Sequence, residues 1–296
     1  MHRDCLMEDT FYKKIALKGW IVIMHRDACP DEVFKIISSV VDLRQNESIL
    51  RQITSTAKSR VFLASLHCSG RNIRVYLKHF PLYFSLRYII YLVCTGRARR
   101  AFRASLMLED SGFNAPRPLV LMEKKYGLFC TNSILLTKDV PDSVQLGEKL
   151  QQFSADGSRD AIRQKRKLIR QFGKVVGEMH QKGILHGDLR LRNVLVQENE
   201  EGFSFWFIDN ERTKRFSRLR PKHVRKNLVQ MNMKLEASNT DRLRFVKAYA
   251  AQRRLINEEV RIIAVMVWKR IELRRKKKAL INLLKVFKKK ALFSKR

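Results

Sequence analysis

The fold of this chain is decided by two stretches, Gly183-Ile-Leu-His-Gly-Asp-Leu-Arg-Leu-Arg-Asn-Val-Leu-Val196 and Phe205-Trp-Phe-Ile-Asp-Asn-Glu211. The first stretch holds a tight polar loop between two apolar runs, and the second is an apolar run that leads to a carboxylate, Asp209. A helical pattern precedes them from Ala161 to Gln181. Gly183 then stops it, because glycine readily adopts the backbone conformation that ends helices. This order of elements makes the polar residues candidates for a site.

The spacing of the polar residues indicates phosphoryl transfer. Asp188 and Asn193 stand five positions apart, as do the Asp and Asn in the H-R-D-x-x-x-x-N loop of kinases. That loop places a carboxylate where it can accept a proton from an incoming hydroxyl, and an amide oxygen where it can bind Mg²⁺. Asp209 stands where kinases keep the carboxylate that bridges Mg²⁺ to the β- and γ-phosphates. Gly187 replaces the usual arginine, so the arginine that reads activation-loop phosphorylation is absent.

The alternative interpretation of this stretch is a polar hairpin loop between two buried strands. An Asp and an Asn five positions apart occur by chance in many chains. The preceding helix, the apolar runs on both sides and the third carboxylate together favour the phosphotransfer site.

The composition describes a globular, strongly basic protein. The chain has 296 residues, of which 45% are hydrophobic, and its 61 Lys and Arg against 28 acidic residues give a net charge of +33. This length suits one two-lobed domain or two small domains. So large a charge favours polyanionic partners, namely nucleic acid, anionic lipid or a phosphorylated glycan, over mere solubility.

The cysteines and the apolar runs indicate a cytoplasmic protein that does not span a membrane. The five cysteines (positions 5, 29, 68, 94 and 130) are scattered without a C-x-x-C pair, as expected for reduced thiols. The first twenty residues lack the apolar core of a signal peptide. No stretch reaches the roughly 18 apolar residues of a membrane span. The nearest, Phe80 to Thr95, is interrupted by Arg87.

Residues 48–80 predict three antiparallel strands, 48–53, 60–66 and 73–80. Lys78 lies on the last of them, among β-branched and aromatic residues, as does the nucleotide-binding lysine of the V-A-I-K strand in kinases. The loop 54–59, where a Gly-rich phosphate flap would lie, contains no glycine. An exposed strand lysine is the alternative, but the position of Lys78 upstream of the polar loop favours the nucleotide role.

Residues 97–109 predict a basic amphipathic helix, where kinases carry a glutamate that pairs with the strand lysine. This helix has no acid before Glu109 in its last turn, so Glu109, Glu123 or nothing replaces that partner.

The other expected elements are listed in chain order. They are a strand at 20–24, a helix from Pro30 to about Val41, strands at 119–122 and 129–136 with a turn at 124–127, an interlobe hinge at 135–140, a loop or lobe surface at 145–160, and helices at 161–182, 220–233 and 240–252, the last capped by Thr240-Asp241.

The last 28 residues hold 13 Lys or Arg and one acid, with apolar residues at helical spacing. A basic amphipathic helix of this kind is typical of membrane-surface binding, to which each basic residue near an anionic leaflet contributes roughly 1 kcal/mol. A tail that binds nucleic acid non-specifically is the alternative. The apolar stripe favours the membrane.

Four pieces in order give the chain a family resemblance. They are Val75-Tyr-Leu-Lys78, then Arg97-Ala-Arg-Arg-Ala-Phe-Arg103 with Gly112 and Pro116-Arg-Pro118, then His186 to Asn193 with Phe207-Ile-Asp209, and finally Thr240-Asp-Arg-Leu-Arg-Phe-Val-Lys-Ala-Tyr249. On these pieces the chain resembles the bacterial lipopolysaccharide core kinases, the Kdo and heptose kinases, over residues 48–250. The last piece is the one that other kinase-like families lack.

The resemblance implies an α+β, protein-kinase-like two-lobed fold, with an antiparallel-sheet N-lobe and a mostly helical C-lobe. We expect an N-terminal extension (1–45), an N-lobe (46–140), a C-lobe with the catalytic loop (141–254) and a basic amphipathic segment (255–296). The implied activity is ATP- and Mg²⁺-dependent phosphorylation of a sugar hydroxyl, on Kdo or heptose, of a lipid-linked glycan. The protein would be peripheral at the cytoplasmic face of the inner membrane, with no specific nucleic-acid partner.

We assign roles from the kinase pattern. Asp188 orients the acceptor hydroxyl and takes its proton, and Arg190 faces the transferring phosphate. Lys78 holds the α- and β-phosphates, while Asn193 and Asp209 hold Mg²⁺. Most of the catalysis would be positioning and charge neutralisation.

Three rival functions remain open. The missing arginine before Asp188 argues against a phosphorylation-regulated protein kinase. The positive charge does not suit an aminoglycoside kinase, whose cationic substrate prefers an acidic pocket. A non-catalytic kinase-like scaffold that binds membrane or nucleic acid is supported by the missing Gly-rich loop and helix glutamate. The intact Asp188, Asn193 and Asp209 count against it, and a nucleotide-binding assay would separate the two.

Overall fold

The computed structural model describes residues 11–17, 19–42, 48–56, 59–68, 70–81, 96–126, 129–232, 238–269, 272–273 and 276. The chain divides into two compact units. The first comprises Met1–Ser143 and Trp206–Thr213, and the second comprises Val144–Phe205 and Lys214–Arg296. Residues 206–213, with Asp209 among them, therefore belong to the unit of Lys78 and not to that of Asp188.

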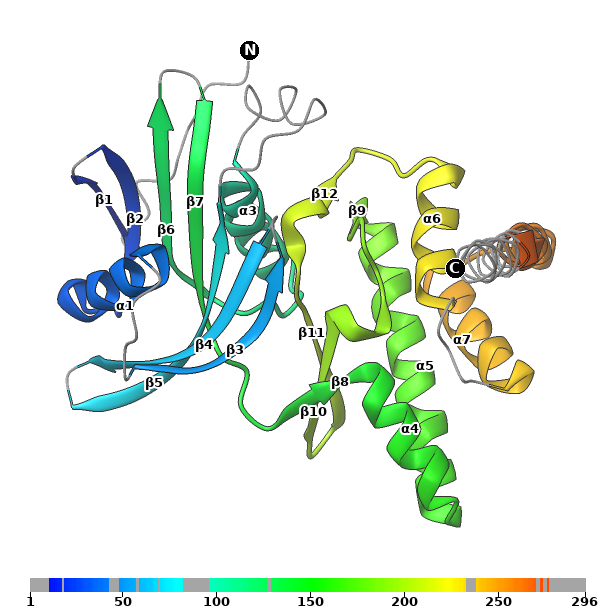
Figure 1. The fold of residues 1–296 in the computed structure, drawn as a ribbon. Coiled ribbons are helices and arrows are strands. Elements are labelled where there is room, and N and C mark those ends of the chain that lie inside the picture. Colours follow the sequence, from blue (N-terminus) through cyan, green and yellow to red (C-terminus); the bar gives the residue numbers. More distant parts are fainter. Residues whose placement is uncertain are drawn as a thin grey trace, which may run out of the picture. The chain divides into compact units, whose positions relative to one another are not determined.

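Within the described residues, the first unit is built on a seven-stranded sheet in the order β1-β2-β6-β7-β5-β4-β3 (Figure 1). Neighbouring strands are antiparallel throughout. The strands are β1 (Tyr12–Leu17), β2 (Trp20–His25), β3 (Ile49–Thr56), β4 (Ser59–Cys68), β5 (Arg71–Phe80), β6 (Pro118–Tyr126) and β7 (Phe129–Lys138), and the helices of this unit are α1 (Pro30–Asp42) and α3 (Arg97–Asp110).

Each face of this sheet supports a core, because side chains along a strand alternate between the two faces. Val120 and Met122 pack into the core that contains Val33 and Ile36 of α1. Leu121 lies between them in sequence and packs into the other core, together with residues of α3 such as Phe102. The helix predicted at 97–109 is therefore present and buries its apolar face on the sheet.

The N-terminal segment differs from the expected extension. Strands β1 and β2 pair with each other and with β6, so residues 12–25 form part of the same sheet as Lys78. Strand β6 also runs through Tyr126, which places Lys124 and Lys125 in a strand where a turn was expected.

The second unit is mostly helical. Its helices are α4 (Leu146–Asp156), α5 (Arg159–Gln181), α6 (Pro221–Asn232) and α7 (Asn239–Gln252), followed by a helix over 257–269. Its strands are β9 (Ile184–Leu185), which pairs with β12 (Lys214–Arg215), and β10 (Val194–Asn199), which pairs with β11 (Gly202–Phe207) and β8 (Ser143–Gln145). The boundary between the units falls within β8 and β11, because Ser143, Trp206 and Phe207 belong to the first unit.

Helix α4 corrects the prediction that residues 145–160 form a loop. Leu146 and Leu150, one turn apart, are buried and give the helix an apolar face despite its polar composition. Gly157 then ends the helix in the left-handed conformation, with a φ of 67°.

The structure also corrects the predicted N-terminal cap of α7. The side chain of Ser238 accepts the backbone N–H of Asp241 at 3.2 Å, so Ser238 occupies the capping position that Thr240-Asp241 was expected to fill.

Two glycines allow α5 and α7 to pack closely. A Cβ on Gly173 would lie 2.7 Å from the backbone oxygen of Phe245, and one on Gly177 would lie 3.0 Å from the backbone oxygen of Tyr249. The first distance is shorter than real Cβ contacts show and the second is tighter than most of them, so a side chain at either position would require movement of α7.

The described residues include three cysteines and several helices whose hydropathy can be examined. Cys29, Cys68 and Cys130 are free thiols, whereas Cys5 and Cys94 lie outside the described residues. Within the described ranges, no helix combines the length and the apolar content that crossing a bilayer requires.

Candidate active site

The polar loop of the second unit lies between β9 and β10, as its flanking apolar runs predict. Gly187 has a φ of 77°, a conformation that favours glycine and turns the chain directly before Asp188. A 3₁₀ turn over Leu191–Asn193 then leads into β10. Asp188 is only 8% exposed and Asn193 5% exposed, so both side chains are held inside the fold.

The carboxylate of Asp188 is oriented by hydrogen bonds from two residues and by an ion pair with a third. Asn193 donates its Nδ2 to the backbone oxygen of Asp188 at 2.9 Å and to Oδ2 at 3.3 Å. Arg190 approaches Oδ1 with its Nε at 2.8 Å. Gln230 donates its Nε2 to Oδ1 at 3.3 Å and to the backbone oxygen of Gly187 at 3.2 Å. Asp188 is thus held in one orientation, with both carboxylate oxygens in contact with donors.

Gln230 is a site residue that the sequence reasoning missed. It lies on α6, 42 positions beyond Asp188. Nothing in the local pattern of α6 distinguishes this glutamine from a solvent-facing residue. Only the packing of α6 against β9 identifies it.

Lys78 and Asp209 meet in the first unit. The Nζ of Lys78 lies 2.5 Å from Oδ1 of Asp209, and the two side chains are 24% and 33% exposed. Asp209 has a φ of 62°, a left-handed conformation that is uncommon outside glycine and often occurs at functional sites. The pairing leaves both groups within reach of solvent.

Helix α3 is tied to the segment that carries Asp209. Arg97 forms a bidentate ion pair with Glu211, with its Nε at 2.8 Å from Oε2 and its Nη2 at 3.1 Å from Oε1. Asn210 donates its Nδ2 to the hydroxyl of Ser105 at 3.2 Å and to the backbone oxygen of Phe207 at 2.9 Å. Both residues that follow Asp209 therefore hold it against the helix and the preceding strand.

The two glutamates considered as partners of Lys78, Glu109 and Glu123, each pair with an arginine instead. Glu123, fully buried on β6, pairs with Arg99 of α3, whose Nε lies 2.7 Å from Oε2. Glu109 pairs with Arg117 at 2.9 Å. The lysine–glutamate pair of kinases is therefore replaced, within the described residues, by the pair of Lys78 with Asp209.

The structure thus gathers the predicted residues into two groups, each within its own unit. Lys78 and Asp209 form one group, and Asp188, Arg190 and Asn193 form the other. Residues 57 and 58 of the loop expected to cover phosphates lie outside the described residues.

The candidate Mg²⁺ ligands have the donor type that this ion prefers. Mg²⁺ binds oxygen, commonly from one or two protein side chains together with substrate phosphates and water. Asn193 directs its amide nitrogen at Asp188, so its Oδ1 is the atom suited to a cation. Asp209 supplies a partly exposed carboxylate. Among the described side chains, no group of three or more His, Cys, Asp and Glu residues is arranged so that it could hold a metal ion.

The comparisons with known proteins agree on one family. A sequence model of the lipopolysaccharide kinase (Kdo/WaaP) family matches residues 51–249. A 3-deoxy-D-manno-octulosonic acid kinase of Vibrio cholerae is 29% identical over 113 residues, which cover 38% of this chain and 43% of that protein. A kinase of the same name from Actinobacillus succinogenes is 30% identical over 123 residues, covering 42% of this chain and 48% of that protein. The chain therefore matches about half the length of these curated relatives.

The comparison with solved structures confirms the fold. The structure described as WaaP in complex with acyl carrier protein aligns with a TM-score of 0.62 and 16% sequence identity, covering 86% of this chain and 98% of that chain. At this identity the likeness concerns the fold alone. It confirms the α+β, kinase-like architecture predicted from the sequence, with an antiparallel sheet in one unit and helices in the other.

Proposed function

The chain belongs to the lipopolysaccharide kinase (Kdo/WaaP) family, and we propose that it transfers the γ-phosphoryl group of ATP to a hydroxyl of a lipopolysaccharide core sugar. The observation that carries the proposal is the buried Asp188, whose carboxylate Asn193, Arg190 and Gln230 hold in one orientation. A carboxylate held in this way can accept a hydrogen bond from an acceptor hydroxyl and take its proton.

The other residues bind and neutralise charge. Lys78 is the cation for the α- and β-phosphates, and it exchanges its contact with Asp209 for the nucleotide. Arg190 is 47% exposed and can extend from Asp188 toward the phosphoryl group in transfer. Because phosphoryl transfer passes through a loose transition state, positioning and charge neutralisation supply most of the catalysis.

Asn193 and Asp209 are the proposed Mg²⁺ ligands. A bound Mg²⁺ would supply neutralisation of the negative charge on the β- and γ-phosphates. The contribution of the protein is the orientation of the two side chains. The Nδ2 contact to Asp188 fixes the amide of Asn193, and the contacts of Asn210 and Glu211 to α3 fix the backbone at Asp209.

Kdo is the proposed acceptor sugar. The relatives described above are both named 3-deoxy-D-manno-octulosonic acid kinases, and their similarity to this chain supports the same acceptor class. The net charge of +33 suits an anionic glycolipid in an anionic membrane. We therefore place the protein at the cytoplasmic face of the inner membrane, as a peripheral protein.

The test is phosphate transfer from ATP to purified lipid A core acceptors that carry Kdo alone or Kdo with heptose. Wild type should phosphorylate the Kdo acceptor, and Asp188→Ala should lose at least ~100-fold in kcat because it lacks the base. Nucleotide affinity should stay close to that of wild type. Asp160→Ala, which removes a carboxylate 72% exposed on α5, is the matched control and should keep full activity.

The other outcomes separate the rival functions. Transfer only to the heptose-containing acceptor would show that heptose, and not Kdo, is the acceptor sugar. Retained turnover in Asp188→Ala would remove Asp188 from the mechanism. If wild type neither transferred phosphate nor bound nucleotide, the result would support the non-catalytic scaffold.

A further inference from the structure

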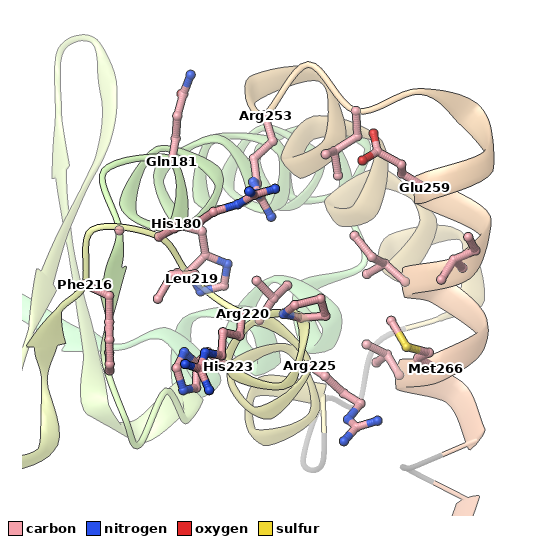
Figure 2. A pocket seen from close by; sticks show the side chains of 18 of the residues that line it. His180, Gln181, Phe216, Leu219, Arg220, His223, Arg225, Arg253, Glu259 and Met266 are labelled. Carbon is pink, nitrogen blue, oxygen red and sulfur yellow. The ribbon is translucent and has the colours of Figure 1, made fainter.

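A large cavity lies in the second unit, and none of the residues assigned above to phosphoryl transfer lines it. Its volume is about 1080 Å³, and its walls come from the end of α5, residues 216–225 and the helix over 257–269 (Figure 2). Ligand sites in proteins commonly measure about 300–1,000 Å³. The cavity is therefore large enough for more than a single small ion.

One side of the cavity is strongly cationic. Arg218, Arg220 and Arg225 line it, and all three are exposed. None of the three has a carboxylate partner among the residues that the structure describes. They belong to residues 214–226, a segment that contains seven Lys or Arg and no acid. Such an unbalanced group of arginines favours an anion, because guanidinium groups bind phosphate in a bidentate manner.

The acidic and imidazole groups of the lining do not offset this charge. Glu259 is the acid among the described lining residues, and its Oε2 accepts the backbone N–H of Ile256 at 3.1 Å. Burial lowers the pKa of His180 to about 4, so this imidazole is neutral at pH 7. Burial also lowers the pKa of His223, and the neighbouring Lys222 and Arg220 lower it further, as expected in a positive field.

The wall of the cavity that comes from the helix over 257–269 is largely apolar. Ile262, Ile263 and Met266 line it from this helix, and Leu255 lines it from the segment before the helix. Ile262 is 50% exposed. Val265 and Trp268 of the same helix do not line the cavity and are 45% and 53% exposed. Exposed aliphatic and aromatic side chains beside unpaired arginines match a ligand with an anionic head and an apolar chain.

We propose that this cavity binds a phosphate-bearing membrane lipid, with its headgroup on Arg218, Arg220 and Arg225 and the start of an acyl chain against Ile262, Ile263 and Met266. A free phosphate ion would not use the apolar wall. A nucleic acid would favour an open basic groove with stacking platforms over a cavity with an aliphatic wall. The proposal goes beyond phosphoryl transfer and does not rest on it. Helix α6 carries Arg225 near its start and Gln230, the partner of Asp188, near its end.

The test is a titration of the full chain with monomeric dihexanoyl phosphatidic acid, in which isothermal titration calorimetry measures the binding. We expect saturable binding with one lipid per chain. Arg218→Gln/Arg220→Gln/Arg225→Gln should weaken it about 10-fold or more, since each cation contributes to headgroup binding. The matched control Arg166→Gln/Arg170→Gln/Lys174→Gln removes the same charge from exposed positions on α5 and should change the affinity less than about 2-fold. Every variant keeps the basic last 28 residues, so the difference between the two triple variants reports on the cavity.

A second variant tests the apolar wall and covers the case in which the triple variant does not fold, as checked by circular dichroism. Ile262→Asn should weaken binding of the lipid about 5-fold or more through lost burial of the chain. Leu243→Asn, at a site 53% exposed on α7, should leave it unchanged.

Three further ligands in the same titration complete the test. Inorganic phosphate that binds as tightly as the lipid would overturn the role of the apolar wall. Dihexanoyl phosphatidylcholine that binds as tightly would overturn the role of the arginines. A single-stranded oligonucleotide that binds more tightly than the lipid, with the same loss in the cavity variant, would assign the surface to nucleic acid and overturn the proposal.

Discussion

Lys78 on β5 and Asp209 beyond β11 stand 131 positions apart and form an ion pair, with 2.5 Å between Nζ and Oδ1. In kinases the strand lysine instead pairs with a glutamate of the neighbouring helix. Here that helix, α3, offers Arg97 to Glu211, two residues after Asp209. Helix α3 therefore still helps to position the partner of Lys78. It does so through an arginine that binds a glutamate near Asp209, whereas the helix of kinases supplies a glutamate that binds the lysine directly.

Lys78→Met should lower the affinity for ATP about 10- to 100-fold, because it removes a charged hydrogen bond to the phosphates. Fluorescent-nucleotide titration in the presence of Mg²⁺ measures the effect. Lys124→Met is the matched control, since Lys124 is an exposed strand lysine on β6 of the same sheet. Equal affinities in the two variants would reduce Lys78 to an ordinary strand lysine.

The Arg97–Glu211 pair should be energetically coupled. In a double-mutant cycle of Arg97→Ala and Glu211→Ala, we expect a coupling of about 1–3 kcal/mol in the free energy of unfolding, since contacting charged groups couple in this range. Glu211 is only 9% exposed, so solvent screens the pair weakly. The affinity for ATP should fall in both single variants, because Asp209 loses its support.

The exposed pair of Arg117 and Glu109 supplies the control cycle. Its side chains are 48% and 45% exposed, and its coupling should stay below about 1 kcal/mol. If the two cycles gave the same coupling, α3 would not be held to the Asp209 segment by this ion pair.

Gln230 is predicted to be a positioning residue for Asp188. Gln230→Ala should lower kcat about 10-fold while the KM for ATP stays near the wild-type value, since the side chain touches Asp188 and not the nucleotide. Gln230→Glu places a second carboxylate beside Asp188 and should move the acidic limb of the pH–rate profile to higher pH, because a like charge disfavours ionisation.

Lys226→Ala, an exposed change on the same helix, is the control for both variants. A purely structural role for Gln230 would lower the stability of its variants and leave the acidic limb in place. That result would contradict the assignment.

The sequence predicts those parts of the site that depend on local order. Asp188 and Asn193 lie in one loop, and the apolar runs on both sides determine the strands that hold it. Lys78 is recognisable because it lies on a strand of β-branched and aromatic residues upstream of that loop. The ion pairs cannot be predicted from the sequence. Arg97 could pair with any of several carboxylates, and only the packing of α3 selects Glu211. Residues 145–160 were misread for a related reason. The helical signal there rests on few apolar residues, and their burial against the rest of the second unit decides the conformation.

The buried His180 should make the stability of the second unit depend on pH. His180 is 2% exposed, its Nδ1 lies 2.9 Å from the hydroxyl of Tyr249, and its Nε2 lies 3.2 Å from Oδ1 of Asn227. Burial lowers its pKa from 6.5 to about 4. Between these values the unfolded chain binds a proton at this site that the folded chain does not, so the free energy of unfolding rises with pH. The contribution is fully present above pH 6.5 and is lost as the pH falls toward 4.

His180→Gln isolates this contribution. At pH 7 the variant should be less stable than wild type, because it loses the imidazole contacts. The difference should shrink by roughly 2–3 kcal/mol between pH 7 and pH 4.5, since each unit of pKa shift corresponds to about 1.4 kcal/mol. Urea unfolding followed by circular dichroism at the two pH values measures it. His67→Gln, an exposed change on β4, controls for the loss of an imidazole in general. A stability difference between wild type and His180→Gln that stays constant with pH would show that folding does not lower the pKa of His180. That result would contradict the neutral network with Tyr249 and Asn227.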